Sequence, residues 1–356
     1  MRSRGIAGAI CAAALLAGTA AAAESGSPEF PRVSVGGVLF ADYTYQAEPA
    51  GRDAEGNTIR QNSFNVSRAY VNVIASLSQL ISVRITPDVV RDTDASGTLS
   101  GSYVYRLKLA FAQLALDDTL GKGSWVRFGL HTTPYLDYLD GIYRYRFQGN
   151  LFLDREGYIP TADLGISARY VFPADYGEVI VGGFNGEGFT RSEVNDQKSL
   201  QVFASLRPAP RAGALRGLRI AAMGDYDHYE RNAPRYRVGG AITFEHPIVH
   251  AGVEYFAAKD RPTATSAEAR GRGWSAYATP RTAIGLEALL RYDHLEPDRS
   301  TDEVKTRAIG GIAYWFPVWK GLASAVLLDY ERVRYSHYSP PRPTEERYAV
   351  HTLVSF

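Results

Sequence analysis

A strict alternation of apolar and polar side chains, repeated along almost the whole chain, is the feature that most constrains the fold. In the segment that begins at Leu164, apolar residues occupy every second position as far as Tyr170, and Gly165, Ser167 and Arg169 lie between them. Successive side chains of a β-strand point to opposite faces, so this pattern predicts a strand with one apolar and one polar face.

A segment nearer the N-terminus repeats the alternation with a basic polar face. Here the pattern predicts that Leu107, Leu109 and Phe111 share the apolar face. Arg106 and Lys108 occupy the intervening positions, so we expect both basic side chains on the opposite face.

Sixteen segments fit this alternation, and they predict an all-β protein. They lie at 33–46, 63–77, 80–91, 102–116, 124–132, 162–172, 177–185, 199–207, 217–229, 235–246, 248–258, 272–281, 284–295, 304–316, 322–335 and 345–356. Fourteen or eighteen strands remain alternatives, because boundaries taken from a pattern shift by about two to four residues.

The connections between these segments alternate in length. Long polar links follow the first strand of each pair, at 47–62, 92–101, 133–161, 186–198 and 259–271. Most intervening links are short turns, and 208–216 is the exception. A soluble sandwich has no reason to sort its loops in this way. Long outer loops and short periplasmic turns are typical of a transmembrane, antiparallel, up-and-down β-barrel of the bacterial outer membrane.

Aromatic residues at apolar-facing positions are sorted by strand end. Nine of them fall at the predicted outer rim, namely Tyr43, Tyr45, Tyr103, Tyr105, Tyr226, Tyr236, Tyr292, Tyr330 and Tyr348. Three fall at the inner rim, namely Tyr170, Phe316 and Phe356. Rings with a polar edge prefer the boundary between lipid and water, so two girdles are expected. The terminal Phe356 also resembles the C-terminal signal of outer-membrane barrels.

The N-terminal segment has the features of an export signal. Arg2 and Arg4 precede an apolar stretch that ends in a run of alanines at residue 23. We therefore predict a signal peptide at 1–23, a short extension at 24–32 and the barrel at 33–356. Cys11 lies in the signal, so the mature chain has no cysteine and no disulfide. Beyond residue 23 no stretch approaches the roughly 18 apolar residues of a spanning helix.

The balance of charge excludes one class of partner. Removal of the signal leaves 37 basic residues of the original 39, against 38 acidic ones, so the mature chain carries a formal charge of -1. A nucleic-acid-binding protein needs a basic surplus on one face. We therefore expect no nucleic acid as a partner.

The polar faces carry too much charge to form a dry core. Burying an unpaired ion costs several kcal/mol, so the barrel must enclose water. About sixteen strands close to a diameter that leaves an aqueous channel. The first six strands would supply a basic lumen wall, which consists of Arg68, Arg84, Arg106, Lys108, Arg127 and Arg169. Later strands mix both signs, which predicts a transverse field across the lumen. The alternative is that these charges pair along neighbouring strands and serve solubility.

The third long link, 133–161, is the candidate constriction. With about 29 residues it is long enough to need a function, and its apolar and aromatic content indicates packing inside the lumen. The residues expected at the constriction are Tyr143, Arg144, Tyr145, Arg146, Asp137 and Asp140. An extended backbone at 143–146 would put both guanidinium groups on one side, where they suit phosphate or carboxylate oxygens. The alternative is that Asp137, Asp140, Asp154 and Glu156 pair with the loop's arginines and fasten the loop.

Four blocks of sequence together resemble the phosphate-selective porin O and P family and its broader porin relatives. They are FNVSRAYVNVIASLSQLISVRITPD at 64–88, VRFGLHTTPYLDYLDGIYRYRFQGNLFLDREGY at 126–158, FNGEG at 184–188 and LEALLRYDHL at 286–295. The resemblance covers most of the mature chain in scattered blocks. It implies a sixteen-stranded barrel, a homotrimer and an inward-folded third loop. Phosphate selectivity in that family depends on lumenal ladders of arginine and lysine, and the six lysines of the mature chain do not reproduce them residue by residue.

These observations predict a passive porin for small hydrophilic solutes, with a preference for anions and, through the resemblance, phosphate as a candidate. Its surroundings would be outer-membrane lipid and lipopolysaccharide. The alternative is a barrel plugged by its third loop, with a structural or hydrolase role.

Other chemistry is absent from the sequence. The seven histidines lack metal-ligand spacing and no nucleotide or nucleophile motif occurs, so we expect no enzyme activity, no metal site and no cofactor. His228 near Asp225 and Asp227 is a conceivable fragment of a hydrolase site. Acidic loop residues such as Asp53, Asp92 and Asp94 either bind Ca²⁺ loosely or only solubilise their loops.

Overall fold

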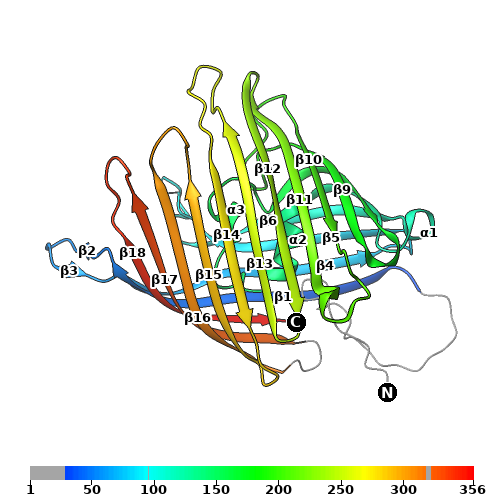
Figure 1. Cartoon of the computed structure of the whole chain (residues 1–356), viewed down its shortest axis with the longest axis horizontal. Coiled ribbons are helices and arrows are strands. Elements are labelled where there is room, and N and C mark those ends of the chain that lie inside the picture. Colours follow the sequence, from blue (N-terminus) through cyan, green and yellow to red (C-terminus); the bar gives the residue numbers. More distant parts are fainter. Residues whose placement is uncertain (1–28, 95, 318–321) are drawn as a thin grey trace.

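The computed structural model describes residues 29–94, 96–317 and 322–356. The predicted signal peptide and residues 24–28 of the extension lie outside the described residues. Within the described residues, sixteen antiparallel strands form one closed barrel, in which each strand pairs with its neighbours along the chain and β1 pairs with β18 (Figure 1). The prediction of an all-β, sixteen-stranded barrel is confirmed.

The strands of the barrel begin and end within two residues of the predicted bounds. They are β1 (Arg32–Glu48), β4 (Asn62–Ser76), β5 (Ile81–Arg91), β6 (Tyr103–Ala115), β7 (Trp125–Thr132), β8 (Ala162–Val171), β9 (Gly177–Phe184), β10 (Ser199–Leu206), β11 (Leu218–Glu230), β12 (Ala233–His246), β13 (Val249–Asp260), β14 (Arg272–Pro280), β15 (Leu286–Glu296), β16 (Val304–Trp315), β17 (Ala323–Ser336) and β18 (Glu345–Ser355).

Short elements occupy the connections. In the first long loop, β2 (Gly51–Arg52) and β3 (Thr58–Ile59) form a small hairpin. The helices are α1 (Asp117–Leu120), α2 (Pro134–Tyr143) and α3 (Phe152–Arg155), and the 3₁₀ turns are η2 (Pro173–Asp175) and η3 (Gly213–Gly217). None of the described helices has the length and apolar character needed to cross a membrane.

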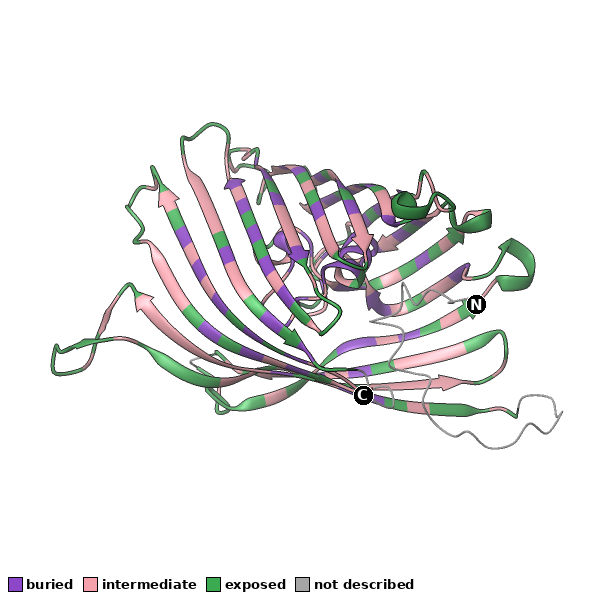
Figure 2. Cartoon of the chain, turned by 60° about the horizontal axis from the view of Figure 1, so that its bottom comes forward, coloured by how far each residue is buried: buried purple, intermediate pink, exposed green. Residues whose placement is uncertain are grey.

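The two faces of each strand differ in burial, as the alternation predicts. On β17, Val326 and Leu328 are exposed on the outside, whereas Leu327 and Asp329 are buried inside. Figure 2 shows the same alternation of buried and exposed residues along many strands. The outer face therefore presents a continuous apolar surface, which hydrocarbon must cover because a soluble chain rarely exposes one so large. The protein lies in the bacterial outer membrane.

Aromatic rings pair across neighbouring strands at the end of the barrel that carries the long loops. The rings of Tyr226 and Tyr236 stack with centroids 4.8 Å apart, and those of Tyr330 and Tyr348 lie 5.0 Å apart. At the other end Tyr170, Phe316 and Phe356 are exposed. This sorting matches the two rims expected from the sequence.

The predicted faces of β6 are wrong beyond Lys108. In the register with β5, Pro87 lies opposite Leu107 and Thr86 lies opposite Leu109, so no residue of β5 lies opposite Lys108. This extra residue is a β-bulge, which reverses the alternation that follows. Leu109 and Phe111 are consequently buried inside the barrel instead of facing lipid.

The last residue closes the barrel against β1. The backbone N–H groups of Phe356 and Gly37 each donate to the other's carbonyl oxygen at 3.0 Å. The ring of Phe356 lies over Gly37, where an added Cβ would meet ring carbons at 2.5 and 2.6 Å. Glycine at this position is therefore required for the terminal ring to cover the seam.

We expect Gly37→Val to lower the stability of the barrel by about 1–3 kcal/mol, because the new side chain displaces the terminal ring. The temperature at which the folded form converts to the unfolded form on a gel measures this effect. Gly310→Val is the matched control, because a Cβ at this outward position of β16 meets nothing within 4 Å. In a Phe356→Ala background, Gly37→Val should lower the stability of the barrel much less. An equal loss of stability in both backgrounds would contradict the contact between the Phe356 ring and Gly37.

Candidate channel constriction

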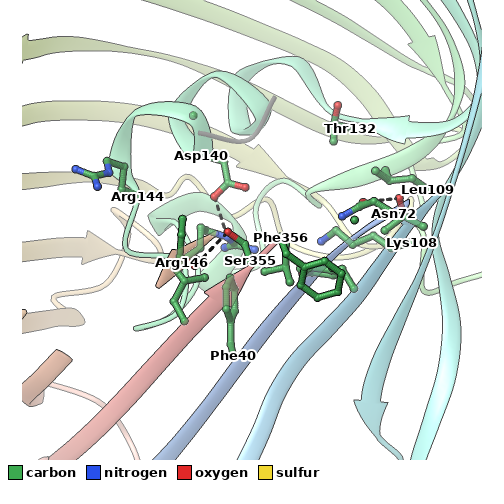
Figure 3. Close-up of a pocket in the computed structure, with 18 of the residues that line it drawn as sticks. Phe40, Asn72, Lys108, Leu109, Thr132, Asp140, Arg144, Arg146, Ser355 and Phe356 are labelled. Atoms are coloured by element: carbon green, nitrogen blue, oxygen red, sulfur yellow. Dashed lines mark hydrogen bonds and ion pairs between the residues drawn. The ribbon is translucent and has the colours of Figure 1, made fainter. Parts of the chain in front are cut away.

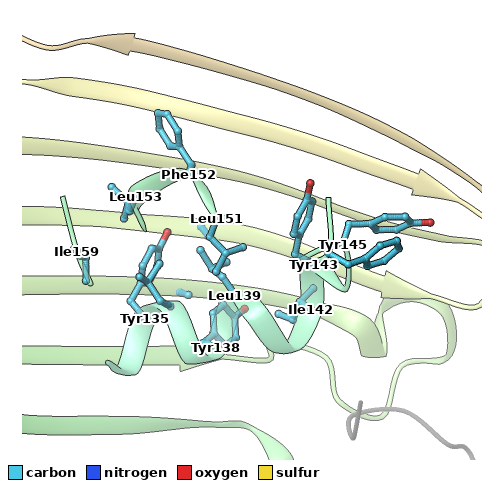
Figure 4. Packing of buried hydrophobic residues seen from close by; sticks show 14 of the residues in the cluster. Tyr135, Tyr138, Leu139, Ile142, Tyr143, Tyr145, Leu151, Phe152, Leu153 and Ile159 are labelled. Atoms are coloured by element: carbon cyan, nitrogen blue, oxygen red, sulfur yellow. The ribbon is translucent and has the colours of Figure 1, made fainter. Parts of the chain in front are cut away.

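The third long loop folds into the barrel as two short helices. Pro134 at the first turn and Asp137 near the N-terminus favour the start of α2. The helix ends where Arg144 adopts a left-handed conformation with φ of 63°. Figure 1 shows α2 and α3 inside the ring of strands, and Figure 4 shows the apolar side chains of this loop beside the strands of the wall.

One side of this loop packs against the apolar part of the wall. The ring of Tyr138 lies 5.1 Å from that of Phe203 on β10, and Phe152 lies 5.5 Å from Phe256 on β13. The buried loop residues of this cluster are Tyr135, Leu136, Tyr138, Leu139, Ile142, Tyr143, Tyr145, Phe147, Leu151, Phe152, Leu153 and Ile159. This packing replaces water on one side of the lumen and fixes the loop in place.

Glu287 on β15 is the first polar anchor of the loop. Arg144 donates to one of its carboxylate oxygens at 3.2 Å, and the hydroxyl of Tyr145 donates to the other at 2.9 Å. The indole N–H of Trp315 donates to the Tyr145 oxygen at 3.1 Å. Tyr143 and Tyr145 are fully buried on this side of the loop, between the helix and the wall.

Glu331 on β17 is the second polar anchor. Its carboxylate lies 3.6 Å from the guanidinium of Arg155, accepts from Gln148 at 3.0 Å and also binds Arg307 and Arg347 of the wall. Burial, together with the positive charge of Arg291 nearby, lowers the pKa of Arg155 to about 10. The guanidinium therefore stays charged at neutral pH and holds the loop to the wall.

Arg146 is held within the loop itself. It lies 3.0 Å from the carboxylate of Asp140 and 3.3 Å from that of Asp154. Burial acts to lower the pKa of Arg146, but these two carboxylates outweigh it and raise the pKa above its ordinary value. The backbone at 143–146 is not extended, because α2 ends at Tyr143 and Arg144 adopts a left-handed conformation, and the two guanidinium groups bind different partners.

The other side of the loop faces a cavity along the opposite wall. Its lining comes from β1, β4, β5, β6, β7, β16, β17, β18, α2 and the segment after α2, and includes Val38, Phe40, Tyr70, Asn72, Arg84, Thr86, Lys108, Asp137, Asp140, Arg144, Arg146 and Leu353. In Figure 3, Asp140 on α2 lies across this space from Asn72 and Lys108. Carboxylates on the helix and basic groups on the wall therefore lie on opposite sides of one cavity.

The six residues of the predicted basic wall all point inward, and most have polar partners. Arg68 and Arg106 each lie 2.9 Å from the carboxylate of Asp88. Arg84 donates to the side-chain oxygens of Asn72 and Thr86.

The strands that follow complete this wall. Arg127 donates to Gln113 at 2.9 Å and lies 4.0 Å from Asp137, and Arg169 pairs with Glu178. Lys108 donates to the hydroxyl of Thr161 at 3.0 Å.

The conceivable hydrolase fragment is not assembled. Asp227 is buried inside the barrel and pairs with Arg235, whereas His228 points outward and packs against the rings of Tyr226 and Tyr236. Successive strand residues face opposite sides, so these two side chains cannot act together.

The acidic loop residues bind their own loops instead of gathering around one point. Asp53 accepts from the backbone of Glu55 and Asn57, and Asp94 accepts from Ser96. Among the described residues no group of three or more His, Cys, Asp or Glu side chains could hold a metal ion.

Three aromatic residues at this site were missed by the sequence analysis. Phe40 and Trp315 line the cavity from β1 and β16, and their inward parity was a signal that could have found them. Phe189 comes from the fourth long loop and lies over the basic wall, with its ring 4.8 Å from the guanidinium of Arg106. No periodic pattern marks a loop residue of this kind.

We expect Glu331→Gln to loosen the loop, because three arginines lose their shared carboxylate and breaking a buried pair costs about 3–5 kcal/mol. Trypsin cleavage after Arg144, Arg146 or Arg155 in detergent-solubilised protein should become faster. Glu346→Gln is the matched control, because Glu346 pairs with the more exposed Arg332 on the outer face. Equal cleavage rates in the two variants would contradict a role for Glu331 as an anchor.

Comparison with known proteins supports the fold. No protein-family model matches the chain, and no curated protein sequence matches it. Among solved structures the chain is similar to the outer-membrane-expressed OmpT of Vibrio cholerae, with 13% identity, coverage of 94% of this chain and 100% of that one, and a TM-score of 0.63. It is also similar to the outer membrane channel DcaP of Acinetobacter baumannii, with 12% identity, coverage of 92% of this chain and 97% of that one, and a TM-score of 0.62. A third similar structure is an anion-selective porin from Comamonas acidovorans, with 12% identity, coverage of 92% of this chain and 100% of that one, and a TM-score of 0.61. These similarities show the fold of an outer-membrane porin and do not single out the phosphate-selective family.

Proposed function

We propose that the protein is a passive channel for small hydrophilic solutes, with a preference for anions. The observation that carries this proposal is the cavity between α2 and the wall formed by β1, β4, β5 and β6. The third loop is fastened to the far wall by Glu287 and Glu331, so it narrows the lumen along one side only. A rigid constriction beside a polar passage suits steady diffusion.

The distribution of charge supports the preference for anions. The wall from β4 to β7 carries five basic residues, namely Arg68, Arg84, Arg106, Lys108 and Arg127. Among the described residues of these four strands, Asp88 is the buried carboxylate that opposes this positive charge. The helix opposite carries Asp137 and Asp140, of which Asp140 is paired with Arg146. Walls of low dielectric strengthen such fields, so a passing anion is attracted to the basic side.

Phosphate is a candidate solute through the sequence resemblance alone. Arginine provides a planar donor fork that suits phosphate oxygens. Most arginines of this wall, however, already donate to Asp88, Asn72 or Gln113. We therefore propose a general anion preference and treat phosphate as one solute to be tested.

A plugged barrel is the second candidate, because the loop packs so extensively. Twelve buried loop residues belong to the same apolar cluster as residues of the wall. If the remaining cavity does not connect both ends of the barrel, the protein would have a structural role. Swelling of liposomes in sugars of increasing size distinguishes the two, because a plugged barrel admits no sugar.

In a planar bilayer we expect a large, steady conductance and a reversal potential that favours chloride over potassium. Adding phosphate to one side measures its competition with chloride. A closed barrel, or one that strongly prefers cations, would contradict the proposal.

We expect Arg144→Ala combined with Arg146→Ala to reduce the preference for anions. The physical reason is that Asp140 and Asp154 lose their counter-charge beside the cavity, and Glu287 loses Arg144. Arg332→Ala combined with Arg334→Ala is the control, because both side chains leave β17 on the outer face. The reversal potential under a salt gradient measures the effect, and an unchanged value would give the loop a structural role only.

We also propose the homotrimer implied by the resemblance. Light scattering of the protein in detergent, corrected for bound detergent, measures the mass of the assembly. A monomeric mass would contradict this part of the proposal without affecting conduction.

A further inference from the structure

Lys108 differs from Arg68, Arg106 and Arg169 of the basic wall in what surrounds its charge, because each of those arginines pairs with a carboxylate. Its ammonium donates one hydrogen bond, to Thr161, and lies 5.4 Å from the ring centre of Tyr70 and 5.0 Å from that of Phe189. Within the part of the chain that the structure describes, no carboxylate forms an ion pair with it. The side chain is only 8% exposed, yet it lines the cavity beside α2.

The alternation of β6 places Lys108 inside the barrel, and the β-bulge changes the face of the residues that follow it. Because the bulge adds one residue, Leu109 faces the inside as Lys108 does, and both are buried. The ammonium is thereby carried to the end of the third loop, where Thr161 meets it. The position of this charge is therefore set by the backbone and not by a mobile surface side chain.

Phe189 is held over Lys108 by a fixed segment of the fourth long loop. The backbone N–H of Gly186 donates to Asp163 at 2.8 Å, and Arg235 donates to the carbonyl oxygen of the same glycine. Gly188 has φ of +76°, and an added Cβ there would meet Pro160 at 2.9 Å. These contacts restrict the backbone conformation directly before Phe189, and so they hold its ring over the basic wall.

An aromatic face holds a cation without cancelling its charge. The negative face of the ring attracts the ammonium, and the ring brings no opposing full charge as a carboxylate would. By contrast, Arg68 and Arg106 share the carboxylate of Asp88, and Arg127 lies near Asp137. Among the described residues, Thr161 accepts one hydrogen bond from Lys108, and the other two N–H groups of the ammonium can donate to a solute.

We propose that Lys108 is the side chain that selects anions in this channel, and that Phe189 is its positioning residue. The inference rests on the proposed channel function and adds to it the residue that contacts the solute and the loop that places this residue. The solute it fits is a small monovalent or divalent anion with accessible oxygen or halide acceptors. The fourth loop, as well as the third, then determines selectivity.

The test is the chloride-to-potassium permeability ratio, measured in planar bilayers near 0.1 M salt, where screening acts over about 10 Å. We expect Lys108→Gln to lower the ratio by about twofold or more, because one positive charge that faces the cavity is lost. Arg68→Gln is the matched control, because it changes the net charge equally at a residue already paired with Asp88. Its effect should be clearly smaller.

Phe189 is tested without any change of charge. Phe189→Leu should lower the permeability ratio, Phe189→Tyr should keep it near wild type, and Phe189→Leu should have no further effect in a Lys108→Gln background. Phe128→Leu is the control, because Phe128 is an exposed ring on the outer face. Each variant is first checked for the heat-dependent shift of the folded barrel on a gel.

The outcomes separate this inference from the proposed function. A wild-type barrel without conductance would overturn the channel and this inference together. A conducting barrel in which Lys108→Gln matches Arg68→Gln would overturn the inference alone. If Lys108→Gln lowers the ratio and Phe189→Leu does not, the positioning role of Phe189 is wrong.

Discussion

Closure of the sheet is the constraint on which the rest of this molecule depends. In hydrocarbon an unpaired backbone N–H or C=O group costs several kcal/mol, so no strand edge can remain open. The pairing of β1 with β18, completed by Phe356 against Gly37, removes the last two edges. With sixteen strands the ring is too wide for side chains to fill from the wall alone.

The width of the ring explains the construction of the interior. One side of the lumen is filled by the third loop, and the strands behind it carry inward apolar residues such as Phe203, Leu289 and Leu327. The other side stays polar, with Arg84 and Lys108 on the wall of the cavity. The same chain therefore contains a conventional apolar core and a cavity with charged groups in its lining, on opposite sides of α2.

Pattern reasoning worked where each residue's face depends only on its neighbours in the chain. The strands, the rims of tyrosine and the inward direction of the basic wall follow from a period of two. The reasoning failed at Leu109 and Phe111, because one bulged residue reverses every later face. It could not show that a left-handed residue at Arg144 ends a helix, so the partners of the two loop arginines were beyond its reach. Neither event leaves a periodic signal.

The sequence by itself determined that the chain has a lipid-facing and a water-facing side, because solvation of each side chain is a local property repeated along every strand. It also marked the third loop as too long and too apolar to be solvent-exposed. Only the tertiary structure decided which charges are neutralised and which remain available. Glu331, Arg155 and Arg347 come together from distant parts of the chain, as do Lys108, Tyr70 and Phe189. Electrostatic partners depend on distance in space, and the closure of the barrel sets that distance.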